Sequence, residues 1–185
     1  MNNSLLRKIA LTSILLISSP LIQAKELESD SIDLGTITYE GNLILGVITL
    51  YGRRTDGHES KYIAFLMVHK YFDREHYVTL SEAQKLLAFI RSREQRFRIS
   101  KEGPEISHLY TFSLERGTTE VGLKNEGLNY RMSNLYKRIF HSIAVGGIPI
   151  SLDAQNKVRF RQMLERGIRW LINRSKSERS ERGSV

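Results

Sequence analysis

The stretch LILGVITLYGRRTDGHESKYIAFLMVHKYF, residues 43–72, indicates most directly how this chain folds. Its two ends, 43–51 and 62–72, are nearly continuous apolar runs rich in β-branched and aromatic residues, and the polar loop between them contains Asp56-Gly57. Two such runs joined by a turn-forming loop predict an antiparallel hairpin. Because neither run alternates with polar residues, we expect both faces of these strands to be covered in the folded protein.

The residues around this hairpin predict further strands and a helix. GTITYEG (35–41) alternates apolar and polar residues, as a half-buried strand does, and 76–80 is predicted to be a short strand. Ser81 and Gln84 have the spacing of a capping box, which marks a helix N-terminus. A helix is predicted over about 82–93, because one face of that segment is apolar and consists of Ala83, Leu86, Leu87 and Ile90.

The second half of the chain repeats the order of strands followed by a helix. Residues 109–115 and 119–124 are predicted to form a hairpin. The stretch 132–143 has apolar residues at helical spacing, and we favour a short helix, although its Tyr and Ile content also permits a strand. After Ser151 a last amphipathic helix is predicted, whose apolar face consists of Phe160, Leu164, Ile168 and Leu171.

Together these elements predict an α+β domain with a mainly antiparallel sheet and two amphipathic helices, and they allow two strands-then-helix halves. The segments 78–90 and 148–164 share an acidic residue followed by Ala-Gln, which is a sign of internal duplication. The preference of helix N-termini for Ser and acidic residues explains the motif without duplication. Two helices on one side of the sheet would leave its other side bare. A homodimer, a partner protein or a folded-over sheet would supply the cover.

Residues 1–24 have the organisation of a secretory signal peptide. Arg7 and Lys8 precede an apolar stretch, and the small residue Ala24 suits signal-peptidase cleavage before Lys25. An uncleaved membrane anchor is the alternative, but a spanning helix needs about 20 predominantly apolar residues and this stretch is shorter. We therefore expect export to the periplasm or outside the cell, with no transmembrane helix left after signal removal.

The rest of the chain is expected to form one domain between two flexible ends. Residues 25–34 are polar and acidic and predict a flexible leader, and 174–185 predict a disordered basic tail. The single α+β domain would then cover 35–173. The full chain has a net charge of +8 and no Cys, which excludes disulfides, thiol nucleophiles and Cys-ligated metal sites.

One cluster of residue types suits catalysis or metal binding. The segment HKYFDREH (69–76) contains His69, Asp73, Glu75 and His76, and His with carboxylates can bind zinc or transfer protons. An ordinary polar turn is the alternative, since the chain has no HExxH, GxSxG, SxxK or Gly-rich nucleotide-binding motif. These four residues are the catalytic candidates, and we expect neither a cofactor nor a metal ion.

Arginines form the other candidate site. They follow the first predicted helix and lie on the polar side of the last one, and Arg suits bidentate contact with phosphate or carboxylate. If the helices lie side by side, the arginines would merge into one anion-binding surface; the alternative is a solvated face that keeps the protein soluble. The predicted anion-binding residues are Arg91, Arg93, Arg96, Arg98, Arg159, Arg166 and Arg169.

These patterns favour an exported, non-enzymatic interaction domain that contacts an anionic envelope component or an acidic protein through an Arg-rich face. One alternative is a small secreted hydrolase that uses the His and carboxylate groups of 69–76, and another is a subunit of an envelope assembly. Nucleic acid is not an expected partner, because export would separate the protein from intracellular nucleic acid.

Overall fold

The computed structural model describes residues 28–53, 58–99, 109–135 and 138–182. The first half of the chain forms a four-stranded antiparallel sheet, sheet A, whose strands follow in chain order and lead into a helix. Its elements are β1 (Glu28–Tyr39), the 3-10 helix η2 (Glu40–Asn42), β2 (Leu43–Arg53), β3 (Glu59–His69), β4 (Phe72–Thr79) and α2 (Leu80–Ile99).

The second half repeats this arrangement as a second four-stranded antiparallel sheet, sheet B, again followed by a helix. The α+β prediction, with mainly antiparallel sheet and two helices, is therefore confirmed. The predicted signal peptide and its cleavage site at Ala24 and Lys25 lie outside the described residues. The elements of the second half are β5 (Leu109–Thr118), β6 (Lys124–Leu135), β7 (Arg138–Val145), β8 (Ile148–Leu152) and α3 (Ala154–Arg182).

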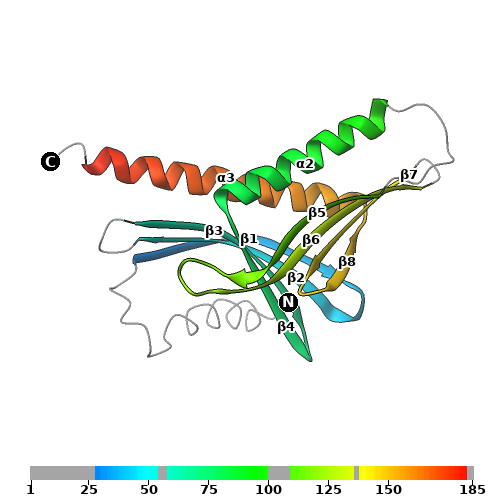
Figure 1. Ribbon diagram of the computed structural model, residues 1–185, viewed down its shortest axis with the longest axis horizontal. Coiled ribbons are helices and arrows are strands. Elements are labelled where there is room, and N and C mark those ends of the chain that lie inside the picture. The colour runs from blue at the N-terminus through cyan, green and yellow to red at the C-terminus, as the bar shows by residue number, and fades with distance from the viewer. Residues whose placement is uncertain (1–27, 54–57, 100–108, 136–137, 183–185) are drawn as a thin grey trace.

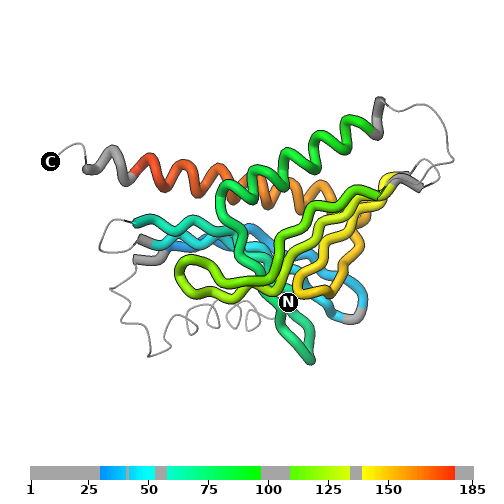
Figure 2. Tube along the Cα trace, viewed as in Figure 1, coloured from blue at the N-terminus to red at the C-terminus, as the bar shows by residue number. Residues whose placement is uncertain are grey.

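Both helices lie on the same side of the two sheets (Figure 1). The path of the chain shows each half running through its hairpins before it enters its helix (Figure 2). One hydrophobic cluster joins the layers, and Phe160 of α3 lies at its centre. The Phe160 ring centroid is 5.8 Å from that of Phe65 in sheet A and 5.5 Å from that of Tyr130 in sheet B. The two halves therefore share one core, with α3 packed against both sheets.

The central strand β3 is buried on both faces, as its continuous apolar run predicts. The odd-numbered residues of 63–67 belong to the cluster that also contains the helices. The even-numbered residues of 62–66 face the opposite side, where Val121 and Leu123 from the connection between β5 and β6 pack against them. The cover on that side therefore comes from the same chain, because the β5–β6 hairpin folds over sheet A.

A glycine lets α3 approach sheet A closely. A Cβ atom at Gly167 would lie 2.7 Å from Leu34 Cδ1 and 2.9 Å from Ile63 Cδ1. Both distances are shorter than van der Waals contact, so a larger residue would push the helix away from a close-packed interior. Glycine is a poor helix former, and its presence in the middle of α3 is explained by this contact.

The two ends of the domain differ from the sequence prediction. Residues 28–34 of the predicted flexible leader belong to β1, and 174–182 of the predicted disordered tail belong to α3. The two segments contact each other, since Arg174 Nε lies 3.4 Å from Asp30 Oδ2, and Ser175 is buried. Composition alone predicted solvated ends because these charges lack partners nearby in the sequence and meet only in the folded chain.

Two local predictions in the second half are wrong. The described part of 132–143 belongs to β6 and β7, not to a helix. The segment 119–124, predicted to be the second strand of the hairpin, instead contains the connection between β5 and β6 at 119–123. In β7 the buried side chains alternate as His141, Ile143 and Val145, which is the period of a strand with one face in the core. The same apolar residues also fall at helical spacing, so the local pattern was ambiguous.

The helix caps also differ in position from the prediction at Ser81. The Glu82 carboxylate accepts hydrogen bonds from both the N–H and the hydroxyl of Thr79 at 2.8 Å, and these residues form the capping box of α2. At the start of α3, Asp153 Oδ1 accepts a hydrogen bond from the Asn156 N–H at 2.7 Å. Each cap lies at the junction between the fourth strand of its half and the following helix. This repetition of strands, cap and helix favours internal duplication.

Candidate functional site

The outward face of α3 carries a row of polar and basic side chains, which we call the α3 stripe. Its members are spaced alternately four and three residues apart, so they lie along one side of the helix. All are exposed, whereas the apolar residues of the opposite side are buried in the core. The α3 stripe consists of Gln155, Arg159, Gln162, Arg166, Arg169, Asn173 and Lys176.

Two acidic side chains, one on each helix, face inward toward the contact between α2 and α3. Glu94 is 15% exposed and Glu165 is 23% exposed, and each lies against an arginine of the other helix. The outward side chains have the opposite charge. Among the described side chains of α2 and α3, the exposed charged ones are all basic, namely Lys85, Arg91, Arg96, Arg159, Arg166, Arg169 and Lys176.

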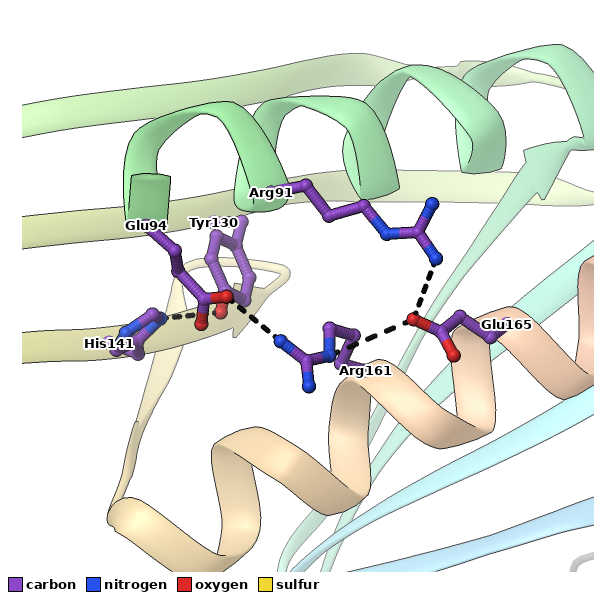
Figure 3. Close-up of polar contacts among 6 residues, drawn as sticks. All are labelled: Arg91, Glu94, Tyr130, His141, Arg161 and Glu165. Carbon is purple, nitrogen blue, oxygen red and sulfur yellow. Dashed lines mark hydrogen bonds and ion pairs between the residues drawn. The ribbon is translucent and has the colours of Figure 1, made fainter. Parts of the chain in front are cut away.

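A chain of ion pairs holds the two helices together (Figure 3). Arg91 Nη2 donates to Glu165 Oε1 at 3.0 Å, and Arg161 Nη1 donates to Glu94 Oε2 at 2.9 Å. Arg161 Nε also lies 3.7 Å from Glu165 Oε1, which links the two pairs. Partly exposed pairs of this kind contribute roughly 0–1 kcal/mol each to stability. Their larger consequence is that the acidic charge of the helices is neutralised internally.

Tyr130 and His141 of sheet B lie beside Glu94, at one end of this chain of ion pairs (Figure 3). The Tyr130 hydroxyl is 2.8 Å from His141 Nδ1, and both side chains are buried. Burial, together with the charge of Lys157, lowers the pKa of His141 to about 4; burial, with Glu94, raises the pKa of Tyr130. Both groups are therefore uncharged at neutral pH. The Tyr130 ring stacks on the ring of Phe160, so the pair belongs to the surface of sheet B on which α3 packs.

The predicted arginines of α2 have different surroundings. Arg93 lies over the Tyr110 ring, with its guanidinium carbon 4.4 Å from the ring centroid, and so packs against β5. Arg91 pairs with Glu165, and Arg96 is exposed. The side chain of Arg98 lies outside the described residues. Of the predicted set, the structure brings Arg159, Arg166 and Arg169 together on one helix face, with Arg91 at the contact between the helices.

The four catalytic candidates of 69–76 do not converge. His76 lies opposite Phe65 in β3 rather than opposite His69, so at about 3.4 Å per residue the two histidines are roughly 14 Å apart along the sheet. Asp73 and Glu75 alternate with His76 along β4, and their side chains therefore point to the other face. In the described ranges, no three His, Asp or Glu residues are grouped closely enough to hold a metal ion.

His76 is a structural residue at the junction of the two sheets. It is buried, and its Nδ1 accepts a hydrogen bond from the Gly127 N–H of β6 at 3.2 Å. Burial lowers the pKa of His76 to about 4, although Glu82 acts in the opposite direction. The imidazole is therefore uncharged at neutral pH, and its hydrogen bond connects sheet A to sheet B.

Sequence reasoning found the arginines of the α3 stripe but missed its length. The polar residues Gln155, Gln162 and Asn173 continue the same spacing and are visible in the sequence as a regular repeat. Reasoning from sequence also missed the inward acidic residues, because Glu94 and Glu165 are remote from each other in the chain. Pairing between the helices could not be predicted from either segment alone.

Neither described helix is long and apolar enough to cross a membrane. No protein-family model, curated protein or solved structure matches this chain. The function has to be inferred from the surface and the contacts of the chain itself.

Proposed function

We propose that this protein is exported and binds, without catalysis, to a surface of anionic phosphate groups through the α3 stripe. One observation carries the proposal. The exposed charges described on α2 and α3 are all basic, while the partly buried Glu94 and Glu165 are neutralised by arginines. The exposed charges described on the helix layer are therefore positive, and the exposed carboxylate of Asp30, which lies beside Arg174, belongs to β1.

The shape of the α3 stripe favours an extended anionic surface over a small free anion. From Gln155 to Lys176 the row is about 32 Å long at 1.5 Å per residue, and it follows a single helix. All members of the row are exposed along the helix, so a surface with many headgroups satisfies the row best. Each basic residue near an anionic leaflet contributes about 1 kcal/mol. Arg159, Arg166, Arg169 and Lys176 would together contribute about 4 kcal/mol.

Binding to lipid vesicles tests this proposal. The protein should co-sediment with vesicles that contain phosphatidylglycerol, and not with vesicles of phosphatidylcholine alone. Raising the salt concentration should weaken the binding, because exposed charges are screened over about 8–10 Å near physiological ionic strength. Replacing Arg159, Arg166 and Arg169 together by Gln should remove about 3 kcal/mol, more than a hundredfold in affinity.

The matched control removes the same net charge elsewhere. Lys70, Arg116 and Lys124 are exposed and lie outside the helices, so replacing them by Gln leaves the α3 stripe intact. The control variant should keep most of the binding. Equal losses in the two variants would show that only net charge matters, and unchanged binding in the stripe variant would show that the α3 stripe is not the contact. Failure of the unaltered protein to bind phosphatidylglycerol would also overturn the proposal.

A further inference from the structure

A pocket lies between sheet B and the end of β1, on the side of sheet B that faces away from the helices. Its volume is about 580 Å³, which is within the usual range of ligand sites, about 300–1,000 Å³. Sheet B provides one wall, and Thr38, Tyr39 and Glu40 provide the other. Because the α3 stripe points outward from the helix layer, a ligand in this pocket would be independent of the surface contact proposed above.

The register of sheet B places a cation and a phenyl ring near each other on this wall. Arg131 of β6 pairs with Ser142 of β7, and Phe140 lies two residues before Ser142 on the same strand. Residues that pair across strands share a face with those two positions away, and diagonal neighbours are about 7–8 Å apart. These three side chains therefore lie on one face, and all three line the pocket. Tyr130 and His141 alternate with them and are buried on the opposite face.

A carboxylate lies on the other side of Phe140 from Arg131. Asp153 directly follows β8 and, by the register between β7 and β8, lies next to Phe140. Since β7 separates β8 from β6, Arg131 and Asp153 are two strand spacings apart, about 10 Å. Glu40 adds a second carboxylate from the facing wall. The pocket thus has a positive end and a negative end.

These charges do not suit a simple anion or a simple cation. Among the described residues that line the pocket, Arg131 is the one cation, and Glu40 and Asp153 are the carboxylates. An anion would be attracted by one group and repelled by two, and a cation would be repelled by Arg131. Arg131 and Glu40 are both exposed, so a ligand can reach them. Asp153 also accepts the capping hydrogen bond from the Asn156 N–H, which leaves Glu40 as the less engaged carboxylate.

The wall between the charged ends is partly apolar. Leu109 is 63% exposed and Phe140 is 50% exposed, and both line the pocket. They flank Ser133 in one cross-strand row, because Ser133 pairs with Leu109 of β5 and with Phe140 of β7. Exposed apolar side chains at a polar-rimmed pocket are typical of an interaction site. They would cover a short hydrocarbon body.

We infer that this pocket binds a small zwitterion whose carboxylate and ammonium lie at opposite ends of a short apolar body. Arg131 pairs with the carboxylate, and the Ser142 hydroxyl donates a hydrogen bond to it. Glu40 and Asp153 accept hydrogen bonds from the ammonium. The apolar body lies on Phe140, between the two charged ends. The ω-amino acids are the simplest ligands of this class.

Titration calorimetry with molecules of equal chain length tests the inference on the full protein. ε-Aminocaproate carries both charges, caproate lacks the ammonium, and hexylamine lacks the carboxylate. We expect ε-aminocaproate to bind and the other two to bind about tenfold more weakly, because each loses one charge-assisted contact. Norleucine is an isomer of ε-aminocaproate with both charges at one end. It should also bind about tenfold more weakly, because it satisfies only one end of the pocket.

Two variants assign the charged contacts. Arg131→Gln should lower the affinity for ε-aminocaproate about tenfold, to that of hexylamine for the unaltered protein. Glu40→Gln should likewise lower it about tenfold, toward that of caproate. Both residues are exposed, so the circular dichroism spectra should not change. The matched controls are Arg116→Gln and Glu115→Gln, which remove exposed charges of β5 outside the pocket and should keep full affinity.

The opposite outcomes would overturn the inference. Caproate or hexylamine binding as tightly as ε-aminocaproate would show that one charge suffices, and equal binding of norleucine would refute the separation of the charges. No binding of ε-aminocaproate at millimolar concentration, or binding that both pocket variants leave unchanged, would refute the site. The α3 stripe variant with Arg159, Arg166 and Arg169 replaced by Gln should bind ε-aminocaproate normally, so failure of this site and failure of the proposed surface contact are distinguishable.

Discussion

Lowering the pH from 7.5 to 5.0 should destabilise this fold by about 4 kcal/mol, because two buried histidines must stay uncharged. The pKa of each of His76 and His141 is lowered by burial from 6.5 to about 4. Below pH 6.5 the unfolded chain binds protons that the folded chain does not bind. Stability is therefore fully present above about pH 6.5 and is lost progressively as the pH falls toward 4.

The magnitude follows from the two pKa values of each histidine. A shift of one pKa unit corresponds to about 1.36 kcal/mol. Each histidine therefore lowers the free energy of unfolding by about 3.4 kcal/mol when the pH falls from above its unfolded pKa of 6.5 to below its folded pKa of about 4. At pH 5.0, which lies between the two pKa values, each histidine lowers the free energy of unfolding by about 2 kcal/mol. Protonated His76 would also lose the hydrogen bond from the Gly127 N–H to its Nδ1, because that nitrogen could no longer accept.

Urea unfolding at several pH values measures this effect. Trp170 is the single tryptophan of the chain and lies partly buried in α3, so its fluorescence reports unfolding. His76→Gln or His141→Gln should each reduce the loss between pH 7.5 and 5.0 to about 2 kcal/mol, and the double variant should nearly abolish it. The control is His58→Gln, because His58 is exposed. A double variant that still loses about 4 kcal/mol would refute the reasoning.

Three further substitutions test contacts that hold the elements together. Gly167→Leu should destabilise the fold by about 1–3 kcal/mol in thermal unfolding, because the side chain overlaps sheet A. Arg161→Ala should cost about 1–2 kcal/mol in urea unfolding, since it leaves the mostly buried carboxylate of Glu94 without its partner. Asn125→Ala should lower the free energy of unfolding by about 1–3 kcal/mol and speed hydrogen exchange of the Tyr77 amide, because the N–H and the carbonyl of Tyr77 both lose their hydrogen bonds to the Asn125 side chain.

Each of these has a control with a distinct outcome. Gly117→Leu should change stability by less than about 0.5 kcal/mol, because a Cβ atom there meets nothing within 4 Å. Adding Glu94→Gln to Arg161→Ala should recover part of the lost stability, and no recovery would contradict the role assigned to the charge. Asn129→Ala, which removes an exposed contact with Ser113, should leave the Tyr77 amide unchanged. Equal exchange rates in the two Asn variants would argue against the contact between Asn125 and Tyr77.

The α+β fold was predictable to a large extent from local patterns. The apolar runs in 43–72 became β2 and β3, and the apolar faces of the two predicted helices lie in the core. The stretch 132–143 was not predictable, because its apolar residues fit both a helical and a strand period. Only the position of β7 between β6 and β8 shows which period the packing uses.

The candidate sites were predictable in part. Arg159, Arg166 and Arg169 were recognised because they share a helical spacing, which is a property of a single segment. The separation of His69 from His76 was not visible, since it depends on the register between β3 and β4. The pocket on sheet B was missed for the same reason, as its walls come from both halves of the chain.

The sequence by itself determined most of the strands and helices and which face of each is apolar, because side-chain direction repeats with a period set by the local backbone. The stretch 132–143 and the two ends of the domain are the exceptions. Only the tertiary structure decided which charges remain exposed and which strand edges remain open. The charge of Glu94 is compensated by Arg161 of the other helix. Asn125 satisfies the edge of β4, whereas within the described part of the chain no strand pairs with the outer edge of β8. These outcomes depend on contacts between remote residues, and a local pattern carries no information about partners that are brought together only by folding.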